Sequence, residues 1–201
     1  MSQGNKDVFI GRQPIFDRRR RTVAYELLHR SGDRQGANVT DDALATAQVL
    51  RTAFRGLGIA TVLGSCRGFV NVDAEILASR RIEALPREQV VLELLETVEI
   101  DARVVARCAE LKRKGYRIAL DDFTRCRSEW EPLLDIADVV KVDVLELDHA
   151  ALAELVRRLR LYPARLLAEK VDSLERARHC LALGFDLFQG FLFGRPALLG
   201  A

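Results

Sequence analysis

Residues 117–144 read RIALDDFTRCRSEWEPLLDIADVVKVDV, and they contain a strand-like apolar run, a short helical piece and a second apolar run. The first run covers residues 117–123, and the second covers residues 139–144. Parallel strands are nearly continuous in apolar residues, because helices cover both faces of the sheet. The segment therefore predicts one βα unit, in which a helix leads from one parallel strand to the next.

The same alternation extends from about residue 66 to the C-terminus, with Gly, Pro or polar breaks between the segments. Short apolar runs predict strands, and longer stretches with a 3.6-residue apolar period predict helices. We expect strands at Phe69–Val72, Val90–Leu95, Arg117–Phe123, Val139–Val144, Arg165–Val171 and Asp186–Phe193. We expect helices at Ala74–Ser79, Asp101–Lys114, Ser128–Leu134, His149–Leu161 and Leu174–Leu183.

The first third of the chain has a different pattern. Val8–Phe16 and Thr22–His29 are strand-like and are separated only by Asp17 and four arginines, which predicts a β-hairpin. One long helix is expected over about Asp41–Gly56. With the hairpin in the remaining position, the segments predict an α/β fold, a (β/α)8-like TIM-type barrel. A doubly wound open sheet is the alternative, although its Gly-x-Gly-x-x-Gly fingerprint is absent after the first strand.

Composition places the chain among globular proteins. It has 201 residues, of which 49% are apolar, and its 31 Lys and Arg against 29 Asp and Glu give a net charge of +2. This charge gives no reason to expect a nucleic-acid polymer or an anionic membrane as partner. No apolar run approaches the ~18 residues of a membrane helix, and the four cysteines form no Cys-x-x-Cys pair. We expect a single cytoplasmic domain over residues 1–201.

Polar side chains interrupt almost every expected strand in its C-terminal half, where burial would favour apolar residues. One such carboxylate alone is more often half-exposed or paired than functional, but here the feature repeats on successive strands. The carboxyl ends of barrel strands meet at one mouth, where the active site lies. The residues are Glu26, Asn71, Glu93, Asp121, Asp122, Lys141, Glu169 and Gln189.

The charges of this set predict a bound cation. Its five carboxylates carry −5 and Lys141 carries +1, which leaves −4 at the mouth. Two carboxylates 4 Å apart repel by roughly 4 kcal/mol at an effective dielectric of 20. Oxygen ligands without Cys or His favour hard ions, so we expect a two-metal site for Mg²⁺ or Mn²⁺. Two such ions suit the hydrolysis of a phosphodiester.

These residues lie in motifs that resemble those of the EAL domain family, the cyclic di-GMP phosphodiesterases of bacterial signalling. The resemblance runs nearly end to end. Its motifs are Gln13-Pro14-Ile15, Tyr25-Glu26-Leu27-Leu28-His29-Arg30, Phe69-Val70-Asn71-Val72, Leu92-Glu93-Leu94-Leu95-Glu96, Ala119-Leu120-Asp121-Asp122-Phe123, Val140-Lys141-Val142-Asp143, Ala168-Glu169-Lys170-Val171-Asp172 and Gln189-Gly190-Phe191-Leu192-Phe193-Gly194-Arg195-Pro196. The Glu-Leu-Leu and Ala-Glu-Lys-Val variants are similar to EAL domains joined to an HDOD domain, which implies that the chain is one half of such a protein.

The resemblance implies a metal centre in which the ligands are Glu26, Asn71, Glu93 and Asp121. Asp122 would hold the second metal or its water.

The resemblance also implies roles for the residues around the metals. Lys141 would orient that water or help to deprotonate it, and Glu169 would be the general base or a further metal-site carboxylate. Gln189 would position ligand and water, while Arg30 would contact the dinucleotide. Glu96 would anchor the loop that follows Asp122.

Two departures from the family keep a second function open. Residues 124–127, Thr-Arg-Cys-Arg, stand where active members carry a Gly-Thr-Gly-type loop, and glycine allows positive φ and close backbone approach. The segment between Arg30 and Asn71 is about one helix shorter than in typical members, so the barrel is expected to be shortened.

The resemblance implies an enzyme that hydrolyses cyclic di-GMP to linear pGpG with Mg²⁺ or Mn²⁺. The alternative is a catalytically inactive cyclic di-GMP receptor or protein-interaction module. In either case the expected partners are cyclic di-GMP, an HDOD or other signalling domain, and a second copy in a homodimer.

Overall fold

The computed structural model describes residues 9–30 and 58–199, so the helix expected at residues 41–56 lies outside the described residues. The strands in these ranges are β1 (Phe9–Asp17), β2 (Thr22–Arg30), β3 (Arg67–Val72), β4 (Val90–Leu94), β5 (Arg117–Phe123), β6 (Val139–Asp143), β7 (Arg165–Glu169), β8 (Leu187–Phe188) and β9 (Ala197–Leu199).

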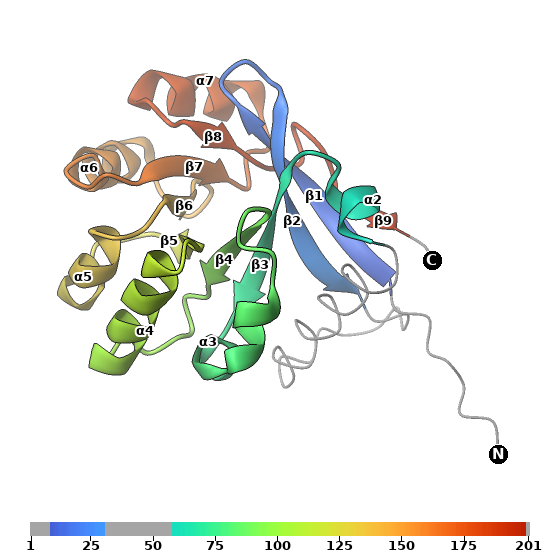
Figure 1. Cartoon of the computed structure of the whole chain (residues 1–201). Helices are drawn as coiled ribbons and strands as arrows, with labels where there is room; N and C mark the ends of the chain where they lie inside the picture. Colours follow the sequence, from blue (N-terminus) through green and yellow to red (C-terminus); the bar gives the residue numbers. More distant parts are fainter. Residues whose placement is uncertain (1–8, 31–57, 200–201) are drawn as a thin grey trace.

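The first eight of these strands close into a barrel (Figure 1). Each strand from β2 to β7 pairs in parallel with the strand that follows it, up to β8, as short apolar runs joined by helices require. β1 closes the ring because it pairs antiparallel with both β2 and β8, and β9 pairs antiparallel with residues 10–12 of β1. The structure confirms the (β/α)8-like TIM-type barrel in which the N-terminal hairpin takes one position.

Helices cover the outside of the ring (Figure 1). The three longest described helices are preceded by the N-cap residues Asp101, Asp148 and Ser173, whose side chains accept hydrogen bonds from free N–H groups of the first helical turn. The helices are α2 (Ile59–Leu63), α3 (Ala74–Ala78), α4 (Ala102–Arg113), α5 (Glu131–Leu134), α6 (His149–Leu159) and α7 (Leu174–Leu183), with 3-10 turns at Arg80–Ala84 and Ser128–Trp130.

A layer of apolar side chains fills the middle of the barrel, and each of the eight barrel strands contributes one of them. Side chains alternate between the two faces of a strand, so residues two positions away from this layer also point into the barrel. The layer consists of Ile15, Ala24, Phe69, Val91, Ala119, Val139, Leu167 and Leu187. A larger apolar cluster lies between the strands and the helices.

The structure differs from the sequence-based expectation near the C-terminus. The strand expected at Asp186–Phe193 forms a ladder only over Leu187–Phe188, because the chain turns at Gly190, where φ is +148°. α2 and β9 were not expected at all. Both are short, and β9 pairs with a strand more than 180 positions earlier in the chain.

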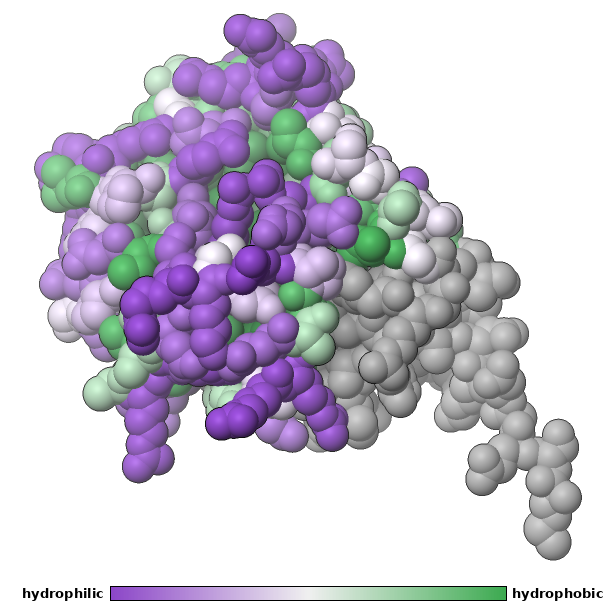
Figure 2. Space-filling view, in the orientation of Figure 1, coloured by the Kyte–Doolittle hydropathy of each residue, from purple (hydrophilic) through white to green (hydrophobic). Residues whose placement is uncertain are grey.

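The outer surface is mostly hydrophilic on the face that Figure 2 shows, and apolar residues are scattered over it. Among the described residues, none of the helices has the length and apolar character needed to cross a membrane.

Candidate active site

The eight side chains that point into the barrel one step beyond the apolar layer are all polar. On the parallel strands each lies two residues after its apolar neighbour, and on the antiparallel β1 it lies two residues before. The set is Gln13, Glu26, Asn71, Glu93, Asp121, Lys141, Glu169 and Gln189. The strand geometry therefore gathers seven residues singled out from the sequence, with Gln13 added, at the carboxyl ends of the parallel strands.

The ammonium group of Lys141 lies at the centre of this layer. It contacts Asp121 Oδ1 at 2.7 Å and Glu169 Oε2 at 3.1 Å, and it lies 3.9 Å from Glu26 Oε2. It also donates a hydrogen bond to Glu93. Lys141 and Glu93 are 2% and 0% exposed, so these charges are separated from bulk water. One buried cation thus faces four carboxylates.

Two amide side chains extend the layer on the side of β1, β2 and β8. Gln189 Nε2 donates to Glu26 Oε2 at 2.5 Å and to Gln13 Oε1 at 3.2 Å. Gln13 Nε2 in turn donates to the carbonyl of Gly194 at 3.1 Å. Gln13 was missed in the sequence because it lies on the antiparallel strand and precedes its apolar neighbour.

A second acidic group lies beside the first at the ends of β5, β6 and β7. Lys170 Nζ lies 2.8 Å from Asp122 Oδ1 and 2.5 Å from Asp143 Oδ2. Asp143 is 2% exposed and also accepts a hydrogen bond from the backbone N–H of Leu145 at 2.8 Å. Lys170 and Asp143 were not singled out from the sequence, although Asp143 follows Lys141 with the two-residue spacing of one strand face.

Burial and charge shift the pKa values of the first group in different directions. Burial raises the pKa of Glu169 to about 8 and raises the pKa of Glu93 well above its usual range. For Asp121 the effect of burial is outweighed by the charge and hydrogen bond of Lys141, so its pKa is lowered. Burial also opposes the charged form of Lys141, but the surrounding carboxylates raise the pKa of its ammonium well above the ordinary value. Near neutral pH, Glu169 of the metal-free protein therefore holds a proton.

The donor atoms of this layer fit a hard divalent cation. Four buried oxygens have no hydrogen-bond partner in residues 9–30 and 58–199: Asn71 Oδ1, Glu93 Oε2, Glu169 Oε1 and Gln189 Oε1. Carboxylate and amide oxygens are the ligands that Mg²⁺ and Mn²⁺ prefer. No three Asp, Glu, His or Cys side chains of the described chain are already grouped as a metal-binding set, and several of the carboxylates are turned toward Lys141. The donor set fits the metal, and a bound ion requires these side chains to turn.

The remaining two residues singled out from the sequence are Arg30 and Glu96. Arg30 ends β2, and its side chain is outside the described part of the structure. Glu96 is exposed, and no hydrogen bond joins it to residues 124–127 in the described part of the chain. That loop is instead supported by Trp130, which is 6% exposed and packs edge-on against Phe123 with ring centroids 5.5 Å apart.

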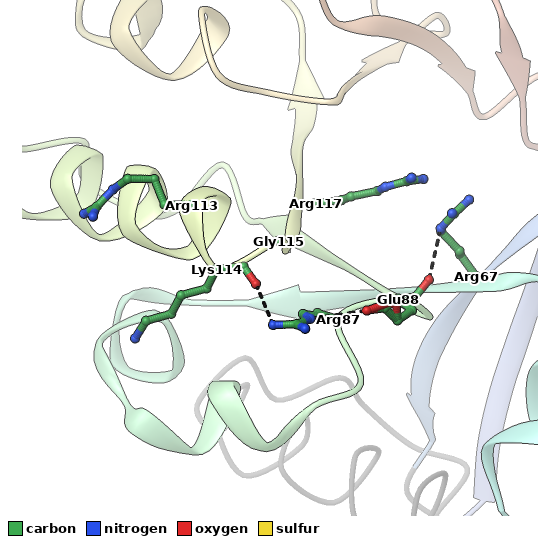
Figure 3. Close-up of a pocket in the computed structure, with 7 residues that line it drawn as sticks. All are labelled: Arg67, Arg87, Glu88, Arg113, Lys114, Gly115 and Arg117. Atoms are coloured by element: carbon green, nitrogen blue, oxygen red, sulfur yellow. Dashed lines mark hydrogen bonds and ion pairs between the residues drawn. The ribbon is translucent and has the colours of Figure 1, made fainter.

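A cavity of about 360 Å³ lies at the opposite end of the barrel, where the parallel strands begin (Figure 3). Arg87 donates a hydrogen bond to the carbonyl of Lys114 beyond the end of α4, and Lys114 pairs with Glu83 and Glu110. The residues that line the cavity are Arg67, Arg87, Glu88, Arg113, Lys114, Gly115 and Arg117. The cavity has one carboxylate, so it lacks the acidic cluster of the mouth.

The fold and the mouth together define a TIM-type barrel with an acidic cluster of lysine-paired carboxylates at the carboxyl ends of its strands. The family model of the EAL domain matches residues 2–196, and the chain belongs to this family.

Two curated relatives and one solved structure illustrate the similarity. The chain is 34% identical over 197 residues to the uncharacterized protein YuxH of Bacillus subtilis, covering 96% of this chain and 48% of YuxH. It is 34% identical over 197 residues to the cyclic di-GMP phosphodiesterase CdgJ of Vibrio cholerae, covering 95% of this chain and 45% of CdgJ. The structure of Bacillus subtilis YkuI, an EAL-domain protein in complex with cyclic di-GMP and calcium, superposes with a TM-score of 0.78 at 22% identity, covering 95% of this chain and 56% of that one. The chain spans about half the length of the two curated relatives.

Proposed function

We propose that this chain is a metal-dependent phosphodiesterase that hydrolyses cyclic di-GMP to linear pGpG. The observation that carries the proposal is the polar layer at the mouth, where four buried oxygens lack a partner in the described chain beside a cluster of carboxylates. The substrate is supported by the name of CdgJ and by the ligand of the YkuI structure.

In this proposal Glu26, Asn71, Glu93 and Asp121 hold one divalent cation, and Asp122 contributes to a second. Such a cation, Mg²⁺ or Mn²⁺, supplies positive charge for a phosphate oxygen and for the leaving oxygen, and it makes water more acidic.

The other residues of the layer orient and accept protons. Glu169 is the general base in its ionised form, which a bound cation would favour, and its raised pKa of about 8 makes that carboxylate a stronger proton acceptor than an ordinary one. Lys141 keeps the neighbouring carboxylates in place and helps to orient the attacking water. Gln189 already donates to Glu26 through its amide, and its Oε1, which has no partner among the described residues, can orient water or ligand. Arg30 contacts the dinucleotide. Glu96 has to turn toward residues 124–127 before it can anchor the loop after Asp122.

The test is an assay of the purified chain with cyclic di-GMP and Mn²⁺ or Mg²⁺, with the product separated by chromatography. Linear pGpG is expected from the unaltered protein, and Glu26→Gln is expected to abolish its formation. Glu75→Gln is the matched control, because Glu75 is an exposed glutamate on α3. The proposal fails if neither metal supports turnover, or if Glu26→Gln retains the activity.

A receptor or protein-interaction module is the second candidate. It is favoured by the Thr124–Arg127 loop and by the pairing of Asp122 with Lys170, which occupies a carboxylate that the reaction would use. Calorimetry separates the candidates. Binding of cyclic di-GMP without product, in the presence of either metal, identifies a receptor, and binding of neither metal nor nucleotide identifies an interaction module.

We also propose that this domain is one half of a longer protein. The curated relatives are about twice as long as the matched region, and the sequence variants resemble EAL domains joined to an HDOD domain. An HDOD or other signalling domain and a second copy of the chain are therefore proposed partners.

A further inference from the structure

Lys170 places a second ammonium group in the acidic mouth. It follows Glu169, the last residue of β7, and its Nζ lies 2.8 Å from Asp122 Oδ1 and 2.5 Å from Asp143 Oδ2. These two carboxylates come from the ends of β5 and β6. One lysine thus joins the carboxyl ends of three neighbouring strands.

The backbone is held in an unfavourable conformation at both ends of this ion pair. Asp122 has φ +50° and Lys170 has φ +57°, in the left-handed region that residues with a Cβ seldom adopt. Arg20 is the only other non-glycine residue with positive φ in the described ranges. Strain of this kind gathers at functional sites and persists only where surrounding contacts enforce it. The ion pair between Lys170 and Asp122 is therefore enforced by the surrounding structure of the mouth.

The choice of residue is informative as well. Lysine occurs at only five positions of the chain, at 6, 112, 114, 141 and 170, and two of them lie in this mouth. A lysine ammonium is a compact point charge, whereas an arginine guanidinium is a wide planar fork. An ammonium group can therefore occupy the position between two carboxylates in which a small metal ion would otherwise bind.

The two lysines leave different charges on the two halves of the mouth. Counted with every carboxylate ionised, as around a bound cation, the four carboxylates and Lys141 sum to −3, whereas Asp122 and Asp143 with Lys170 sum to only −1. Asp122 and Asp143 both accept hydrogen bonds from Lys170 Nζ, so this ammonium faces both carboxylates of the second half. A divalent cation is attracted much more strongly to the first half than to the second.

We propose that Lys170 replaces much of the charge of a second divalent cation, so that this chain binds one divalent cation tightly and a second one only weakly. The inference rests on the proposed metal-dependent function. Under this inference, Lys170 determines how many metal ions the mouth binds tightly, because it pairs with Asp122.

A purely structural role is the competing explanation, because Asp143 is buried and needs a positive partner. In that case removal of the lysine lowers the melting temperature and leaves the binding of metal ions unchanged. Lys170→Gly removes the charge and relieves the backbone at φ +57°, and Lys170→Gln removes the charge alone. The two variants together separate the effect of charge from the effect of misfolding.

The test is a Mn²⁺ titration of the whole chain, in which electron paramagnetic resonance counts free and bound ions. The unaltered protein is expected to bind one ion tightly, and both Lys170 variants are expected to bind the second ion at least about tenfold more tightly than the unaltered protein does. Lys112→Gln is the control, because it removes a lysine paired with Asp138 away from the mouth. Circular dichroism melting verifies that each variant is folded.

Two tight ions in the unaltered protein would overturn the inference, as would Lys170 variants that bind the second ion no more tightly. Both results leave the proposed phosphodiesterase intact. Absence of any bound Mn²⁺ in the unaltered protein and in all variants would overturn the inference together with the metal-dependent function. The two failures can therefore be told apart by whether the first ion binds.

Discussion

At the scale of single residues, Lys141 faces more carboxylates than any other basic side chain in the described part of the chain. Its ammonium is buried among four carboxylates, so its removal leaves like charges facing one another in a dry environment. We expect Lys141→Met to lower the free energy of unfolding of the metal-free protein by about 3–5 kcal/mol, measured by urea denaturation near pH 8. Addition of Mn²⁺ is expected to restore more stability to this variant than to the unaltered protein.

Lys112→Met provides the comparison for this prediction. The Lys112 and Asp138 side chains are 28% and 29% exposed, and a pair that is partly in water contributes about 1 kcal/mol or less. Equal losses in the two variants would show that the carboxylates at the mouth do not depend on Lys141.

Gly190 is the residue whose missing side chain matters most. Its φ is +148°, and a Cβ there would lie 2.2 Å from the carbonyl oxygen of Val171. We expect Gly190→Ala to lower the free energy of unfolding by more than about 3 kcal/mol and to displace the adjacent Gln189 from Glu26. Gly64→Ala is the control, because Gly64 also has positive φ, +59°, with open space around it, and its loss is expected to be about 1 kcal/mol. Denaturation curves of equal midpoint would refute the role of the close contact.

The positions of the site residues could be predicted from the sequence because strands alternate their side chains with a period of two. Glu93, Asp121, Lys141 and Glu169 each follow an inward apolar residue by two positions, which is visible without a structure. The contact of Lys170 with Asp122 could not be predicted in this way. It depends on two left-handed backbone conformations beyond the ladder, where the strand period no longer applies.

At the scale of elements, the segment after β5 combines an unusual loop with a well-packed support. Phe123 ends the strand, and Trp130 covers it at an interplanar angle of 89°. We expect Trp130→Ala to lower the free energy of unfolding by about 3–5 kcal/mol, because a large buried ring is replaced by a cavity.

Trp130→Phe is the matched variant for this element, since it retains an aromatic ring against Phe123. We expect it to retain most of the stability and to leave metal binding at Asp122 unchanged, as measured by thermal melting and Mn²⁺ titration. A loss equal to that of Trp130→Ala would show that the indole makes a specific contact that the edge-on packing does not explain.

Elements with a strong local signal were predicted, and those defined by distant partners were not. α4 has a capping Asp101, basic residues in its last turn and a glycine after it, so its bounds are nearly those expected. α2 has five residues and no side-chain cap. β9 exists because Ile10, Gly11 and Arg12 of β1 offer it a pairing edge, which no local pattern of residues 197–199 reveals.

At the scale of the whole molecule, barrel closure concentrates acidic groups that no local segment could hold together. Each of the eight barrel strands contributes one residue to the inward-facing polar layer at the mouth, and the apolar layer beneath separates these residues from the other end of the barrel. Folding therefore has to overcome the repulsion between these carboxylates and the cost of burying them. The free energy of unfolding must then depend on whether they are protonated.

The direction of this dependence follows from the raised pKa values. Glu169 has a folded pKa of about 8 against an ordinary value of 4.5, and burial also raises the pKa of Glu93. Between pH 4.5 and 8 the folded state therefore binds more protons than the unfolded state, and the stability of the metal-free protein must fall as the pH rises. Each such group contributes a slope of up to about 1.4 kcal/mol per pH unit in this window. Lys141 adds no slope here, because its pKa is raised above 10.5 and its contribution is constant at lower pH.

We expect urea denaturation in the presence of a chelator to show decreasing stability from pH 5 to pH 8, and Glu169→Gln to flatten this decrease because the amide does not titrate. Glu75→Gln, on the exposed surface of α3, is expected to leave the slope unchanged. A metal-free protein whose stability is constant or rises over this range would mean that the carboxylates at the mouth are ionised at little cost. If Glu169→Gln kept the slope of the unaltered chain, the proton bound on folding would reside elsewhere in the barrel, and its assignment to Glu169 would be wrong.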